Sequence, residues 1–126
     1  MELTLKCVLY TIFAISLFTG VNGLIGGASA IPGVTTVVGA AIDNELRCMS
    51  VFWLTYGVFC FWVARSISKR HLFIPFIALV MLLSGFARLL SVLLVGMPGN
   101  ALLFAMIVEF ILSLVIYCSY KKLKFV

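Results

Sequence analysis

Long apolar runs alternate with short polar breaks along the chain, and this pattern predicts membrane-spanning helices. A membrane helix needs about 20 mainly apolar residues. Runs of this kind lie at residues 7–24, 46–64, 72–95 and 101–120. The last two breaks are short, which favours antiparallel neighbours. We therefore predict an all-α integral membrane protein, a four-helix up-down bundle forming a single transmembrane domain over residues 1–126.

The connection between the first two runs, from Ile25 to Asn44, is long and apolar. It is rich in Gly and Ala, contains Pro32-Gly33 and carries no charge before Asp43. Such a segment is too apolar for a freely solvated loop. Non-helical backbone at membrane depth must be covered by protein or water. We expect it to lie against the membrane surface or to dip into the bundle, partly as a short helix.

The first apolar run also has some features of a secretory signal peptide. Lys6 precedes it, and Ala28-Ser29-Ala30 follows it as a loose match to a cleavage site. However, Glu2 offsets the single basic residue, and the run is long enough to span a membrane. A retained helix is the favoured interpretation.

Composition and charge placement support a membrane location. Hydrophobic residues make up 64% of the chain and charged residues 10%, against about 25% charged in ordinary soluble domains. Seven basic residues flank the apolar runs: Lys6, Arg65, Lys69, Arg70, Lys121, Lys122 and Lys124. A nucleic-acid-binding protein would instead collect its basic residues on one folded face. By the positive-inside rule, both termini and the second connection are cytoplasmic.

Two charged residues interrupt the third and fourth runs. Arg88 lies seven residues before Val95, and Glu109 lies eight residues after Ala101. At 1.5 Å per residue, both are about 10–12 Å below the outer surface. An ionised side chain at this depth usually needs a partner or a water-filled cavity. We predict an Arg88–Glu109 ion pair.

Small and hydroxyl residues recur at helical spacing beside these charges, and small residues allow close helix packing. We expect these faces to meet inside the bundle: Ser84, Gly85, Arg88 and Ser91; Ala105, Glu109 and Ser113; and Ser16, Thr19, Gly20 and Gly23.

A second polar cluster opens the second run. Asp43 or Asn44 could cap that helix, and Glu45 would suit the dipole of its first turn. Arg47 lies about one turn further on and could turn inward, toward Glu109. The sharper interpretation is one polar ligand site in the outer half of the bundle, built from Asp43, Arg47, Arg88 and Glu109. The alternative is a buried network that only fixes helix register.

The sequence offers little equipment for catalysis. The single histidine, His71, lies in the basic second connection, far from the polar site. No Ser/His/Asp set, phosphate loop or zinc spacing can be assembled, and no CxxC is present. The cysteines Cys7, Cys48, Cys60 and Cys118 are expected to be buried apolar thiols. We predict no enzyme activity, no catalytic or metal-ligating residues and no cofactor.

Three motifs resemble those of a known family. They are DNxxR at Asp43, Asn44 and Arg47, GxxRLLS from Gly85 to Ser91, and the central Glu109. The chain resembles a bacterial four-helix inner-membrane family of unknown function. Its AciT-like members are associated with keeping the Gram-negative envelope barrier intact. The resemblance implies the bacterial inner membrane and envelope maintenance, and it supplies no reaction.

The leading hypothesis is a non-enzymatic protein that supports the envelope by binding membrane lipids through the polar site. A protein partner or a second copy of the chain is the other binding hypothesis, and nucleic acid is not expected. The alternative function is a small proton-coupled exporter that uses Glu109. Small multidrug exporters, however, carry their glutamate in the first helix. Some of them also insert in both orientations, which needs a weak Lys/Arg bias, whereas the bias here is seven to one.

Overall fold

The structure, a computed structural model, describes residues 1–123 and is all-α over them. Lys124, one of the basic residues used for orientation, lies outside the described residues. The elements are α1 (Glu2–Gly26), η1 (Gly27–Ala30), α2 (Ala40–Ala64), α3 (Ile67–Arg70), η2 (His71–Phe73), α4 (Ile74–Val95) and α5 (Asn100–Lys122).

Within residues 1–123, four helical segments are long and apolar enough to cross a membrane. They span Glu2–Ala30, Ala40–Ala64, Ile67–Val95 and Asn100–Lys122. The helical fold class predicted from the apolar runs is confirmed. The chain is a multi-pass membrane protein.

The start of α2 differs from the prediction. The helix begins at Ala40, six residues before the predicted start at 46. The Gly39 carbonyl already accepts hydrogen bonds from the backbone N–H groups of Ile42 and Asp43. The prediction that Asp43 or Asn44 caps this helix was wrong, because the apolar residues before them are already helical. Asp43 instead lies in the first turn.

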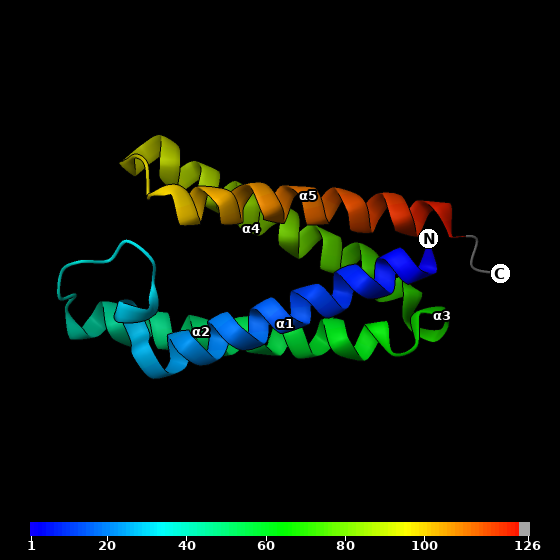
Figure 1. Cartoon of the computed structure of the whole chain (residues 1–126), viewed down its shortest axis with the longest axis horizontal. Helices are drawn as coiled ribbons and strands as arrows, with labels where there is room; N and C mark the ends of the chain where they lie inside the picture. Colours follow the sequence, from blue (N-terminus) through cyan, green and yellow to red (C-terminus); the bar gives the residue numbers. More distant parts are fainter. Residues whose placement is uncertain (124–126) are drawn as a thin grey trace. The chain divides into compact units, whose positions relative to one another are not determined.

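The chain divides into two compact units, which are described separately. The first, the α1–α2 unit, is Leu9–Trp62. Its two helices run antiparallel, joined by η1 and an extended segment (Figure 1). Small residues let the helices approach: a side chain on Gly20 would meet Leu54, and one on Gly57 would meet Ser16.

A side-chain hydrogen bond adds to this packing. Trp53 Nε1 donates to Thr19 Oγ1 over 2.6 Å, and Thr19 in turn donates to the Ile15 carbonyl. The small face predicted on the first helix is therefore a packing face, and its partner within this unit is α2.

The second unit, the α4–α5 unit, holds Met1–Val8 and the chain from Val63 onward. Helices α4 and α5 run antiparallel on either side of a tight turn (Figure 1). Gly96 and Gly99 take φ of 119° and 100°, a region that L side chains rarely adopt. The predicted turn at residues 96–100 is confirmed, and glycine makes it possible.

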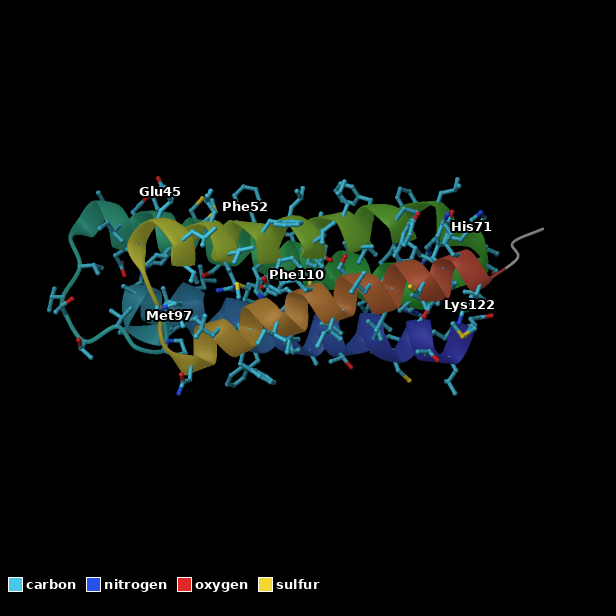
Figure 2. The ribbon with its side chains drawn as sticks, turned by 90° about the horizontal axis from the view of Figure 1, so that it is seen from above. Glu45, Phe52, His71, Met97, Phe110 and Lys122 are labelled. Carbon is cyan, nitrogen blue, oxygen red and sulfur yellow. The ribbon has the colours of Figure 1, made fainter. Side chains whose placement is uncertain are left out.

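The two ends of the α4–α5 unit differ in charge. Figure 2 places Met97 of the turn at one end and His71 and Lys122 at the opposite end. The basic residues Lys69, Arg70, Lys121 and Lys122 occupy the last turns of α3 and α5. The second connection and the end of α5 therefore share one basic end, as the sequence predicted.

The expectation of buried cysteines holds only for Cys60. Cys7, Cys48 and Cys118 are exposed on the protein surface, and no disulfide joins the cysteines of residues 1–123. A free cysteine behaves as a small apolar residue. Sequence hydropathy alone does not separate the lipid-facing surface from the packed interior.

Candidate functional site

The predicted ion pair between α4 and α5 is confirmed. Arg88 Nε donates to both carboxylate oxygens of Glu109, at 3.0 and 3.1 Å. Arg88 lies seven residues from the end of α4 at Val95, and Glu109 lies nine residues from the start of α5 at Asn100. Both are therefore roughly 10–14 Å from the helix ends at the turn.

The two partners differ in exposure. The Glu109 side chain is 6% exposed, whereas that of Arg88 is 39% exposed. Within the span, neither charge can be neutralised by bulk water. The carboxylate is thus held inside the protein, while part of the Arg88 side chain remains accessible from outside.

Close packing between α4 and α5 fixes the level of this pair. A side chain on Gly85 would meet the Phe110 ring at 3.1 Å, so glycine lets that ring lie against α4. Figure 2 shows Phe110 in the middle of α5. The Phe86 and Phe110 rings meet edge to face, with centroids 5.2 Å apart.

A buried hydroxyl provides a second link between the same helices. Ser113, one turn beyond Glu109, donates from Oγ to the Ala78 carbonyl over 2.8 Å. Ser113 is 5% exposed. The interhelical bonds and the ring contact together set the register in which Arg88 faces Glu109.

A small cavity of ≈ 100 Å³ adjoins the Arg88 side chain on the same two helices. Its lining comes from α4, the turn and α5: Arg88, Ser91, Val92, Pro98, Leu102 and Met106. Arg88 and Ser91 are the polar members, and the other walls are apolar. The cavity therefore leads from the guanidinium toward the turn that ends the unit.

The α1–α2 unit holds a separate charged pair. Arg47 Nε donates to Asp43 Oδ2 over 2.8 Å, and Arg47 Nη1 donates to the carbonyls of Leu24 and Ile25 at 2.7 and 2.8 Å. Asp43 Oδ1 accepts the Ala28 backbone N–H. We name these five residues the clasp.

The clasp gives hydrogen-bond partners to the polar backbone groups at the end of α1. The last carbonyls of α1 have no partners within the helix, and a cation at this end also suits the helix dipole. Gly27 follows α1 with φ of +55°, and a side chain there would meet Asp43 and Arg47. The chain therefore closes tightly enough for the end of α1 to reach the start of α2.

The structure sorts the four predicted site residues into two pairs, each within one unit. Arg47, which the sequence suggested could turn inward toward Glu109, bonds to Asp43 and to the carbonyls of Leu24 and Ile25 at the end of α1. The sequence does not reveal these carbonyl partners, and the approach of Arg47 to Glu109 stays a prediction. A single ligand site containing all four residues stays a prediction.

The lining of the cavity was not foreseen, although the sequence carries a signal for part of it. Leu102 and Met106 lie seven and three residues before Glu109, on the same side of α5. Pro98 could be placed nearby from the turn. Over residues 1–123, no three His, Cys, Asp or Glu side chains gather in a way that could hold a metal ion.

Comparison with known proteins gives a family but no characterised relative. No curated protein and no solved structure matches the chain. The family described as a domain of unknown function, DUF4345, matches residues 4–120. The match reaches into all four spanning helices and includes the Asp43–Arg47 and Arg88–Glu109 pairs. The chain therefore belongs to the DUF4345 family.

Proposed function

We propose that this protein supports the barrier of the bacterial envelope from the inner membrane, without catalysis, by binding a membrane lipid or a membrane partner beside Arg88. The observation that carries the proposal is a charged pair deep in two apolar helices, with its arginine open to a cavity. Ionisable groups at such depth are costly and are usually functional.

The proposed orientation has both termini in the cytoplasm. It is supported by the basic residues at one end of the α4–α5 unit. The cavity and the Gly96–Gly99 turn then belong to the outer half of the membrane. The role in the envelope barrier rests on the resemblance to AciT-like proteins through the DNxxR and GxxRLLS motifs and Glu109.

The competing function is a proton-coupled exporter. Such a transporter needs a carboxylate that exchanges protons and substrate. The Glu109 carboxylate already faces Arg88, which would compete with a cationic substrate. This geometry favours a fixed pair with an accessible arginine over a coupling carboxylate.

Cells that lack the protein should regain their barrier with the unmodified chain but not with the R88Q/E109Q variant. The double variant replaces both charged groups with neutral amides, so it avoids leaving one buried charge unpaired. Uptake of a membrane-impermeant dye, at matched protein levels, measures the barrier. Full complementation by R88Q/E109Q would contradict the proposal.

The same cells and protein separate the two functions. If the protein is an exporter, proteoliposomes should show proton-dependent flux that E109Q abolishes in a correctly folded protein. An absence of flux in proteoliposomes of the unmodified protein, together with a lost barrier in R88Q/E109Q cells, supports the binding function. As a matched control, Arg65→Gln changes an exposed arginine and should leave dye uptake unchanged.

A further inference from the structure

Arg88 satisfies Glu109 with only part of its guanidinium. A guanidinium has five N–H donors, and here Nε alone supplies both bonds to the carboxylate. Over residues 1–123, the two Nη atoms of Arg88 make no hydrogen bond. The side chain is also 39% exposed. A set of forked donors is therefore left over at membrane depth.

The cavity beside these donors offers a second polar group. Ser91 lies one turn beyond Arg88 and also lines the cavity. Within the described residues 1–123, its hydroxyl makes no hydrogen bond either. A water molecule needs about 10–15 Å³, so a volume of ≈ 100 Å³ is large enough for a small ionic group. The other lining residues are apolar, so only Arg88 and Ser91 can hydrogen-bond to such a group through their side chains.

The chemistry of these groups selects the ligand. A guanidinium fork matches phosphate geometry and binds it by two parallel hydrogen bonds. A hydroxyl adds another donor, whereas the apolar walls of Val92, Leu102 and Met106 suit the carbon atoms bonded to the phosphate oxygens. The next residues of α4 after Val92, Leu93 and Leu94, are exposed apolar side chains.

We propose that the cavity binds the phosphodiester group of a membrane phospholipid. The Nη atoms of Arg88 and the hydroxyl of Ser91 donate to the phosphate oxygens, and Glu109 keeps the guanidinium in place through Nε. The acyl chains lie outside the cavity, along the apolar surface of the unit. This inference rests on the proposed function and names its ligand.

Thermal unfolding of delipidated protein in neutral detergent tests the inference. Phosphatidylglycerol and phosphatidylethanolamine should each raise Tm. Dioleoylglycerol, used beside phospholipids with the same dioleoyl chains, has no phosphate and should not raise Tm. Inorganic phosphate at the same concentration should have little effect. Equal shifts with phosphatidylglycerol and dioleoylglycerol would overturn the inference, and an equal shift with inorganic phosphate would overturn the lipid as its source.

Two variants tie the shift to the cavity. R88Q/E109Q should bind phosphatidylglycerol at least about tenfold more weakly, because it loses the charged fork. Ser91→Leu fills the cavity without touching the ion pair and should also remove the shift, which keeps the test valid if the double variant fails to fold. A normal shift in folded Ser91→Leu protein would contradict the inference.

The outcomes also separate this inference from the proposed function. A lost barrier in R88Q/E109Q cells, with no phosphate-dependent shift in the unmodified protein, leaves the function standing and overturns only the headgroup. A phosphate-dependent Tm shift in the unmodified protein, with a normal barrier in the R88Q/E109Q cells, overturns the proposed function and leaves the phosphate-binding site standing.

Discussion

Glu109→Gln should lower the free energy of unfolding by roughly 3 kcal/mol. The substitution keeps the shape of the side chain but removes the charge to which Arg88 Nε bonds. The value lies at the low end for a broken buried pair, because the Arg88 side chain is 39% exposed and is therefore only partly buried in the protein. Titration with sodium dodecyl sulfate in mixed micelles measures the loss.

The double variant R88Q/E109Q provides the control for this prediction. It should recover most of the lost stability, since two neutral amides can bond to each other and neither charge is left in the span. A double variant that loses the sum of the two single effects would mean that the residues are not coupled, and the pair would have no role in holding α4 against α5.

Arg47→Met should lower the free energy of unfolding by roughly 2 kcal/mol. The change removes the bonds to Asp43 and to the carbonyls of Leu24 and Ile25, together with the cation at the end of α1. The residue is 41% exposed, so water replaces part of the loss. Local opening should also speed hydrogen exchange at the Ala28 amide, which bonds to Asp43.

Two substitutions calibrate the effect of Arg47→Met. Asp43→Asn retains an oxygen that can accept the Ala28 N–H, and Arg47 keeps its two carbonyl bonds, so less than half the effect is expected. Arg65→Met makes the same chemical change at an exposed position and should stay within about 0.5 kcal/mol. Equal losses for Arg65→Met and Arg47→Met would mean that the clasp contributes no specific stability.

Helix existence and the level of the ion pair could be predicted from sequence. Apolar length sets the spans, and the tight turn carries the glycines its backbone needs. Counting residues from that turn then places Arg88 opposite Glu109, because the helical rise is constant. These predictions depend on local geometry alone.

The clasp and the cavity depend on geometry that sequence patterns do not encode. The partners of Arg47 are backbone carbonyls, which every residue has, and they come within reach only because the chain turns at Gly27. The start of α2 was missed because Ala40 begins it without a polar marker. The cavity depends on how the side chains of Leu102 and Met106 pack.

The Asp43–Arg47 pair and the Arg88–Glu109 pair have different roles, and the difference follows from their hydrogen bonds. Arg47 donates hydrogen bonds to three protein groups, the Asp43 carboxylate and two carbonyls at the end of α1. Arg88 bonds through Nε to a single partner and also lines a cavity. We therefore assign the clasp to stability and the Arg88 site to binding, and their variants should differ in the same way.

Native mass spectrometry of the protein, extracted gently from bacterial membranes, tests the central claim most directly. The account predicts that the unmodified protein and the Arg47→Met variant retain phospholipid, and that R88Q/E109Q and Ser91→Leu lose it while remaining folded. Equal phospholipid retention by all four proteins would contradict a binding site at Arg88.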